Sequence, residues 1–222
     1  RAYMAEVKYK QALDFAAANK AKETYETLLS AMSLNPYRDV YRVTYSQTNL
    51  LIANNLKDRE MIVKLVQQAI DSAKNAAALN RSNVVNWENL ASIYKTLQSY
   101  AQGADNLALQ AYQQAIQLDP INPNLRIDAG GVFYAAKNYD EAIRLFQQAI
   151  DLKPDLANAY YNLAAAYKLK KEPEKAKLAL EKVLTLVDKN SPDYAKAMSD
   201  LPTPSPTPLL SPPIKLDVAT PS

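Results

Sequence analysis

Cysteine and histidine are both absent from the 222-residue sequence, and glycine occurs only 3 times. The absence of cysteine excludes disulfides and thiol chemistry, and the absence of histidine excludes an imidazole base. A transition-metal site would have to be built from carboxylates alone, which suit such metals poorly. The sequence contains no glycine-rich loop for a phosphate. We therefore expect no enzymatic activity, no catalytic residue, no metal site and no cofactor.

Long apolar runs are also missing, because no stretch of 18 apolar residues occurs, and this fragment is predicted not to insert into a membrane. Neither sign of charge dominates, since 26 basic and 23 acidic side chains leave a net charge of +3. That balance argues against a nucleic-acid partner or an acidic-membrane surface. The sequence begins at Arg1 without a signal-peptide pattern, which predicts a mature fragment or an excised domain.

The stretch from residue 123 to 188 repeats itself with a period of 34 residues. A fixed period of this length is typical of stacked helical hairpins. Small side chains fit where two helices cross closely, and large side chains fill the gaps between them. The matching small positions pair Gly130 with Ala164 and Ala142 with Ala176, and the matching large positions pair Phe133 with Tyr167 and Phe146 with Leu180.

These two units resemble the tetratricopeptide repeat family, whose helix pairs place small, aromatic and proline residues at fixed positions. Residues 123–156 follow that pattern closely, including the turn from Tyr139 to Ala142 and the exit at Pro154. Residues 157–190 follow it as well, except that Asp188 replaces the proline. The resemblance implies an all-α fold, a right-handed α-solenoid of about five hairpins with a capping helix and an extended proline-rich tail.

One solenoid domain is predicted over residues 1–201. Repeat 39–83 is about eleven residues longer than the period, with helices expected over 39–54 and 58–79. In the capping helix, Tyr194, Ala197, Met198 and Leu201 are expected to share the packed face, and Asp193, Lys196 and Asp200 to lie away from it. The predicted repeats are 5–38, 39–83, 84–122, 123–156 and 157–190, and the capping helix is 191–201.

Residues 202–222 form a separate tail that holds 7 of the 13 prolines. Such a composition predicts an extended, polyproline-like chain. A plain linker has no need of large apolar side chains, so we expect them to anchor the tail on a partner. These tail anchors are Leu209, Leu210, Ile214, Leu216 and Val218.

The concave face of the solenoid is the candidate peptide-binding surface. Its asparagines could bridge successive peptide groups of an extended strand, because each carboxamide both donates and accepts. The alternative is that Asn89 and Asn162 bond within their own hairpin. The basic and asparagine pair that the family uses to clamp acidic C-termini is missing, so chaperone-tail recognition is not expected. The predicted lining is Asn89, Asn124, Asp128, Asn158, Tyr161, Asn162 and Lys168.

Other conspicuous residues are expected to be structural. Acidic pairs such as Asp140–Glu141 fall at helix starts, where negative charge suits the helix dipole. Trp87, the only tryptophan, is expected to pack in the core. The apolar residues Tyr3, Met4 and Val7 near the N-terminal edge have two interpretations: they lie against their own hairpin, or they meet another subunit.

Two functions remain open at this point. In the first, the chain assembles with itself head to tail into an extracellular filament, and the tail of one subunit docks on the next. In the second, it is a monomeric scaffold for an extended peptide of another protein. Residues 35–42 resemble the repeat region that follows the membrane spans in bacterial proteins of the O-antigen-ligase type. That resemblance implies an extracellular or cell-surface location, while a cytoplasmic one stays open.

Overall fold

The computed structural model describes residues 1–201. This part of the chain consists of eleven helices and no strand, which confirms the expected all-α fold. The tail anchors Leu209, Leu210, Ile214, Leu216 and Val218 lie outside the described residues. The helices are α1 (Ala2–Ala17), α2 (Ala21–Leu34), α3 (Asp39–Asn54), α4 (Arg59–Leu79), α5 (Val84–Leu97), α6 (Ala104–Leu118), α7 (Pro123–Ala135), α8 (Tyr139–Leu152), α9 (Ala157–Leu169), α10 (Pro173–Leu186) and α11 (Pro192–Asp200).

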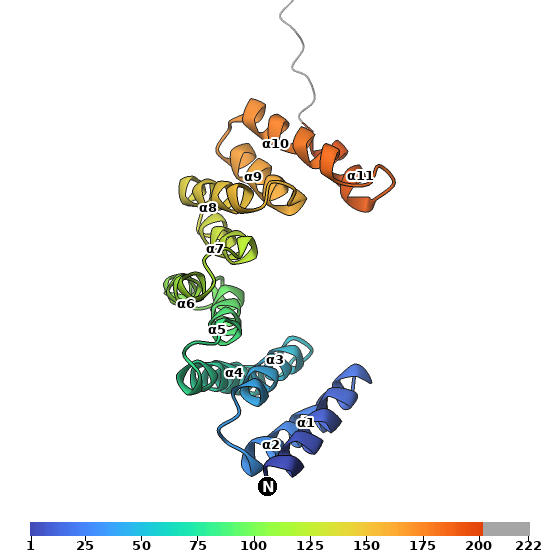
Figure 1. The fold of residues 1–222 in the computed structure, drawn as a ribbon, viewed down its shortest axis with the longest axis vertical. Helices are drawn as coiled ribbons and strands as arrows, with labels where there is room; N and C mark the ends of the chain where they lie inside the picture. The colour runs from blue at the N-terminus through green and yellow to red at the C-terminus, as the bar shows by residue number, and fades with distance from the viewer. Residues whose placement is uncertain (202–222) are drawn as a thin grey trace, which may run out of the picture.

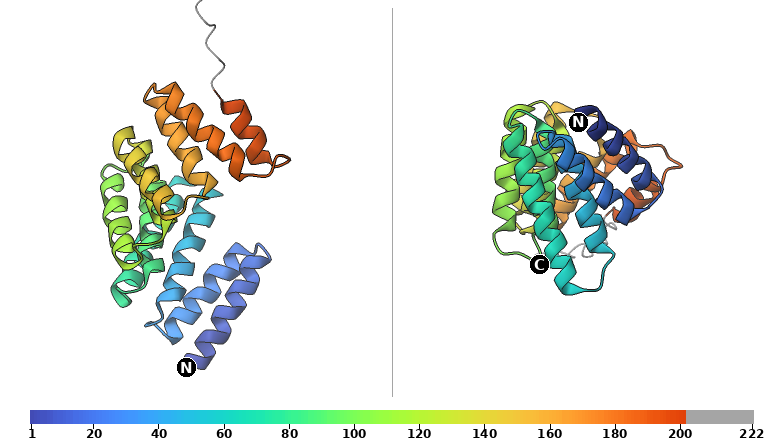
Figure 2. Two further views of the ribbon diagram at one scale, coloured as in Figure 1. Left: turned by 45° about the horizontal axis from the view of Figure 1, so that its top comes forward. Right: turned by 90° about the horizontal axis from the view of Figure 1, so that it is seen from below.

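The helices pair into five hairpins, from α1–α2 to α9–α10, that stack into an elongated solenoid (Figure 1). Successive hairpins touch through the second helix of one and the first helix of the next. Helix α11 packs on α10 and closes the C-terminal end, opposite the N-terminal hairpin (Figure 2). Across residues 1–201, no helix is both long enough and apolar enough to cross a membrane.

A residue in the left-handed backbone region ends the first helix in three of the hairpins. These residues are Asn19, Lys137 and Lys171, with φ of 56°, 60° and 62°. The backbone N–H of the next residue donates to the backbone carbonyl of the aromatic residue five positions before it. One example is the bond from the Asn138 N–H to the Phe133 carbonyl at 2.9 Å. This arrangement satisfies carbonyls that the end of a helix would leave unpaired. The 34-residue period therefore repeats the turn as well as the helices.

Five of the eleven helices in residues 1–201 begin beside a polar side chain that accepts from one of the first free backbone N–H groups. The side chains of Asp58, Asn83 and Asn138 accept in this way at the starts of α4, α5 and α8. Asn122 and Ser191 do the same before α7 and α11, and proline follows each of them. Proline suits this position because its missing N–H would have had no partner.

Helices α7 and α8 cross closely at a glycine. Gly130 is buried against the ring of Phe146, which is only 1% exposed. A Cβ atom added at Gly130 would lie 2.5 Å from Cε1 of Phe146, which is closer than carbon atoms pack. Ala142 on α8 and Ala164 on α9 are buried in the same part of the molecule. Small residues therefore set how closely these helices approach, as the sequence predicted.

The contact between the second and third hairpins combines an apolar cluster with a network of hydrogen bonds. The Asn86 side chain is fully buried and its Nδ2 donates to Oδ2 of Asp39 at 2.9 Å and to the Ala76 carbonyl at 3.0 Å. Asn83 donates to the same Asp39 oxygen at 3.0 Å. Burial acts to raise the pKa of Asp39, but the hydrogen bonds from Asn83 and Asn86 outweigh it, and the pKa lies below its ordinary value. The ionised form of Asp39 thus joins α3 to α5.

The first prediction compares two adjacent glycines of α7. Gly130→Ala should lower the free energy of unfolding by about 1–3 kcal/mol, because the new methyl overpacks the crossing with Phe146. Gly131→Ala is the matched control. Its Cβ would meet only the end of the Lys95 side chain, at 3.3 Å from Nζ, and alanine favours a helix over glycine by up to about 1 kcal/mol. Urea unfolding of both variants checks this, and equal stability of the pair would contradict the assigned crossing.

The second prediction concerns acid stability. Because the pKa of Asp39 is lowered in the folded state, its contribution is present above the ordinary carboxyl value of 3.8 and is lost as the pH falls through the lowered pKa. Asp39→Asn should therefore lose less stability than the wild type between about pH 6 and about pH 3. The exposed Asp155 provides a control as Asp155→Asn. Urea midpoints across this range measure the difference, and identical pH profiles for all three proteins would refute it.

Candidate interaction surfaces

Asn89 of the predicted groove is not available to a peptide. Its side chain is buried, its Nδ2 donates to Oγ of Ser46 at 2.9 Å, and its Oδ1 accepts from Nε2 of Gln47 at 3.1 Å. Both partners lie on α3 of the preceding hairpin. The expectation of bonding within its own hairpin was thus wrong in detail, because Asn89 holds two hairpins together instead.

Asn162 does bond within its own helix. Its Nδ2 donates to the Asn158 carbonyl at 2.8 Å and to Oδ1 of Asn158 at 3.0 Å. Asn124 is exposed in the first turn of α7, away from these residues in the chain. Asp128 forms an ion pair with Nζ of Lys95 at 2.8 Å. Asn158 and Asn162 are thus bonded to each other and Asp128 to Lys95, while the peptide-binding role of these residues stays a prediction.

Two groups near Asp128 have raised pKa values, in part because of its negative charge. Burial raises the pKa of Glu88 on α5, and the charges of Asp128 and Asp119 raise it further. Burial likewise raises the pKa of Tyr112, helped by the charges of Asp128 and Glu88. Lys95 is the cation that pairs with this group through Asp128. Within residues 1–201, no group of three His, Cys, Asp or Glu side chains could hold a metal ion.

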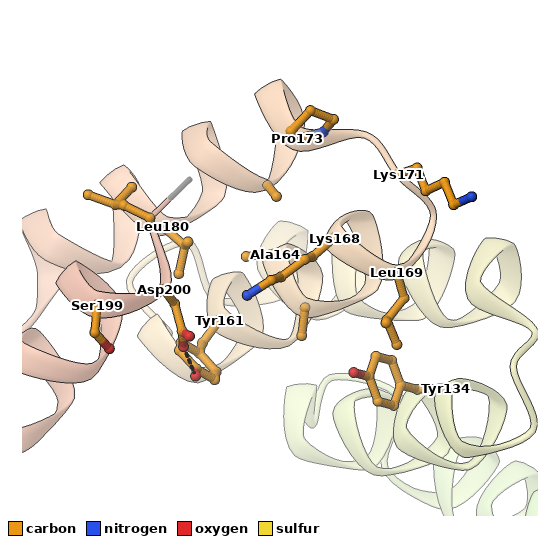
Figure 3. A pocket seen from close by; sticks show the side chains of 13 residues that line it. Tyr134, Tyr161, Ala164, Lys168, Leu169, Lys171, Pro173, Leu180, Ser199 and Asp200 are labelled. Carbon is orange, nitrogen blue, oxygen red and sulfur yellow. Dashed lines mark hydrogen bonds between the residues drawn. The ribbon is translucent and has the colours of Figure 1, made fainter. Parts of the chain in front are cut away.

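A hollow between α9, α10 and α11 has a volume of about 730 Å³ (Figure 3). We call it the α9–α11 cavity. It brings together two of the predicted groove residues, Tyr161 and Lys168, with residues of α11 that the sequence did not suggest. Its lining is Tyr134, Tyr161, Ala164, Ala165, Lys168, Leu169, Lys171, Pro173, Ala176, Leu180, Ser199, Asp200 and Leu201.

Tyr161 forms a wall of this cavity and holds α11 in place. Its hydroxyl donates to Oδ2 of Asp200, as the dashed line in Figure 3 shows, and Nζ of Lys196 lies 4.6 Å from the centre of its ring. Burial and the bond to Asp200 raise the pKa of Tyr161, so the phenol keeps its proton and continues to donate. A smaller cavity of about 240 Å³, lined by Asn158 and Lys196 among others, lies against the same tyrosine.

This contact corrects the prediction for the capping helix. Lys196 and Asp200 were expected to lie away from the solenoid, yet both contact Tyr161. Met198 was expected on the packed face, yet it is 48% exposed. Ala197 is buried, as expected. The apolar spacing alone missed the polar contact because it carries no information about the partner tyrosine on α9.

The N-terminal edge of the solenoid exposes apolar side chains on α1. Tyr3 is 79% exposed, Met4 50% and Val7 42%. Tyr3 therefore does not pack against its own hairpin, Met4 and Val7 are covered only in part, and the contact with another subunit stays a prediction. Trp87, by contrast, is half-buried, and its Nε1 donates to the Arg81 carbonyl at 2.8 Å.

A second apolar hollow lies between α2, α3 and α4 and has a volume of about 490 Å³. We call it the α2–α4 groove. Apolar and aromatic side chains line most of it, together with two lysines. The lining residues are Ala21, Lys22, Tyr25, Ile52, Leu56, Met61, Lys64, Leu65 and Gln68.

The third prediction tests how α11 is held. Tyr161→Phe removes the donor to Asp200 and should destabilise α11 by about 0.5–1.5 kcal/mol, seen as faster amide exchange over residues 192–200. Tyr160→Phe is the matched control, because the Tyr160 hydroxyl donates at 3.1 Å to the Pro154 carbonyl and does not touch α11. Equal exchange in the two variants would show that the Tyr161 hydroxyl does not secure the helix.

Part of the chain matches known repeats in sequence. Residues 130–171 match a family model described as TPR repeat, and residues 157–188 match one described as tetratricopeptide repeat. These matches do not bear on the resemblance of residues 35–42 to proteins of the O-antigen-ligase type, which stays a prediction.

Solved structures share the fold over most of the chain. A thermophilic TPR protein from Thermus thermophilus is 18% identical with a TM-score of 0.64, covering 88% of this chain and 97% of its own. YrrB, described as a TPR protein with an unusual peptide-binding site, is 19% identical with a TM-score of 0.61, covering 86% and 89%. MamA (residues 41 to the end) from Desulfovibrio magneticus RS-1 is 13% identical with a TM-score of 0.67, covering 82% and 94%.

The sequence matches cover the fourth and fifth hairpins, and the structural matches extend the same architecture to the degenerate hairpins before them. The sequence matches fall in the same stretch where the 34-residue period and its small residues predicted tetratricopeptide repeats, and the solved structures show that the solenoid fold is shared over most of the chain.

Proposed function

We propose that this chain is a non-enzymatic protein–protein interaction solenoid that assembles with itself. In this proposal, the C-terminal end of one copy meets the N-terminal end of the next, and residues 202–222 dock on that neighbour. Such a contact joins two different surfaces, so it can repeat without closing and build a filament.

The exposed apolar edge of α1 is the observation that carries the proposal. Tyr3, Met4 and Val7 are exposed in the first two turns of α1, at the N-terminal end of the solenoid. A terminal repeat normally turns a polar face outward to remain soluble. Burying one such side chain contributes about 1.5–3 kcal/mol, so covering the edge with another copy favours association.

The C-terminal end offers a complementary surface. The α9–α11 cavity opens there, and Met198 on α11 leaves a large apolar side chain uncovered beside it. Leu201, the last described residue, lines the same cavity. The apolar tail therefore follows in sequence directly after a residue of this cavity. This supports the proposal that the cavity and the tail take part in the same contact with the next copy.

The α9–α11 cavity also favours a second candidate function, a monomeric scaffold that binds an extended peptide of another protein. Its volume of about 730 Å³ is in the range of ligand pockets, and Tyr161 and Lys168 offer it an aromatic face and a cation. YrrB, of similar fold, is described as having a peptide-binding site. The two candidates differ in whether the purified chain remains monomeric.

The proposed location is extracellular or at the cell surface, and its support is the resemblance of residues 35–42 to the repeat region of O-antigen-ligase-type proteins. The absence of cysteine and histidine supports a scaffold rather than an enzyme. The near-balanced charge supports a protein partner over a nucleic acid.

The fourth prediction tests assembly. Full-length chain should form concentration-dependent particles by light scattering and filaments in electron micrographs. Replacing Tyr3 and Val7 together by glutamine should weaken association at least tenfold, because a loss of about 1.4 kcal/mol already gives that factor. Deleting residues 202–222 should also reduce assembly.

The matched control replaces Tyr100 and Val85 by glutamine, since these are an exposed tyrosine and valine away from both ends of the solenoid. This variant should assemble as the wild type does. A chain that remains monomeric at high concentration would refute self-assembly and favour the peptide scaffold. Assembly that is insensitive to the α1 changes would instead show that the N-terminal edge is not the contact.

A further inference from the structure

The α2–α4 groove comes from the unusual length of the second hairpin. Helix α4 has 21 residues, whereas α6 and α8, which occupy the same place in later hairpins, have 15 and 14. The first two turns of α4 supply Met61 and Lys64 to the groove, and the α3–α4 turn supplies Leu56. Figure 2 shows this turn projecting from the side of the stack. The groove therefore lies outside the concave face.

The lining of the groove combines apolar and aromatic side chains with two cations. Tyr25, Ile52 and Met61 belong to the first group, and Lys22 and Lys64 are the cations. The hydroxyl of Tyr25 donates to Oε1 of Gln68 at 3.3 Å, which leaves the amide nitrogen of Gln68 as the group able to donate to a ligand carbonyl. An apolar segment that carries a carboxylate fits these features.

We propose that the α2–α4 groove receives residues 209–218 of a neighbouring copy. This proposal rests on the head-to-tail assembly proposed above and names the site that the tail occupies. The segment carries five large apolar side chains to contact the apolar lining, and Asp217 to pair with Lys64. The volume of about 490 Å³ is in the range of ligand pockets.

The length of the chain before this segment fits a neighbour. Residues 202–208 separate Leu201 from Leu209, and seven residues in the polyproline conformation span about 22 Å at roughly 3.1 Å each. Packed helices lie about 8–10 Å apart, so this length crosses about two helix layers, which is the depth of one α1–α2 hairpin.

The placement of the groove also favours a neighbour over the same chain. In a head-to-tail stack, the tail starts beside the α1–α2 hairpin of the next copy, and the groove lies just behind that hairpin. Within one chain, the groove and Leu201 are near opposite ends of the solenoid (Figure 1). The tail of the same chain would have to run back past three hairpins.

Engineered cysteines test this directly, because the full-length chain contains no cysteine of its own. One preparation carries Met61→Cys and the other Leu210→Cys, and the two are mixed under oxidising conditions. A disulfide forms only where the Cβ atoms approach to about 4 Å. We expect a covalent dimer joining the two preparations, and a chain carrying both cysteines should give a ladder of covalent oligomers.

Val63→Cys is the matched control, since Val63 lies on the same helix, is more exposed than Met61 at 62% against 43%, and does not line the groove. It should give several-fold less dimer with Leu210→Cys. Equal yields in a chain that still assembles by light scattering would overturn the groove as the tail's site, while head-to-tail assembly would stand. If the doubly substituted chain forms a crosslink within one copy and none between copies, the tail docks on its own chain and the proposal is overturned. Absence of both crosslinks and assembly would refute the proposed function as well.

Charge exchange gives an independent measurement on the full chain. Lys64→Glu should raise the concentration needed for assembly several-fold, because it places like charges at Lys64 and Asp217, and combining it with Asp217→Lys should restore the wild-type value. Lys57→Glu, in the nearby α3–α4 turn and outside the groove lining, should have no such effect. If Lys64→Glu assembles like Lys57→Glu, Lys64 does not pair with Asp217, and the charge argument for the groove as the site of the tail is refuted.

Discussion

The close approach of helices at small residues is the constraint on which the rest of this solenoid depends. At Gly130 not even a methyl group fits beside Phe146, and Ala142 and Ala164 are buried in the same cluster. Each hairpin is too thin to enclose a core, so it is stable only because its neighbours come near enough to cover it. The turns and the surface hollows follow from the same distance between packed helices.

The sequence predicted the fold well because the spacing of small and large residues records this packing directly. It expected helices over 39–54 and 58–79 from the same pattern, and the structure has them at Asp39–Asn54 and Arg59–Leu79. The left-handed turns at Lys137 and Lys171 were not foreseen, because lysine has no preference for that backbone region. Only the period itself could have indicated them.

The candidate surfaces were harder to predict, because polar residues do not reveal their partners in a sequence. Asn89 and Asn162 look alike in the repeat pattern, yet one joins two hairpins and the other bonds within its helix. Tyr161, predicted for the concave face, lines a hollow, but its partner Asp200 comes from a helix whose packing was judged by apolar spacing alone. The α2–α4 groove depends on how a lengthened hairpin sits against its neighbour, which spacing does not encode.

The polar contact between the second and third hairpins has a mechanical consequence. Apolar faces can slide over each other with little change in free energy, whereas the hydrogen bonds that join Asp39 to Asn83 and Asn86, and Asn89 to Ser46, require fixed directions. A rotation of α5 against α3 would therefore break several of these bonds at once. A solenoid under load along its axis would keep the angle between these two hairpins nearly constant as long as the bonds hold.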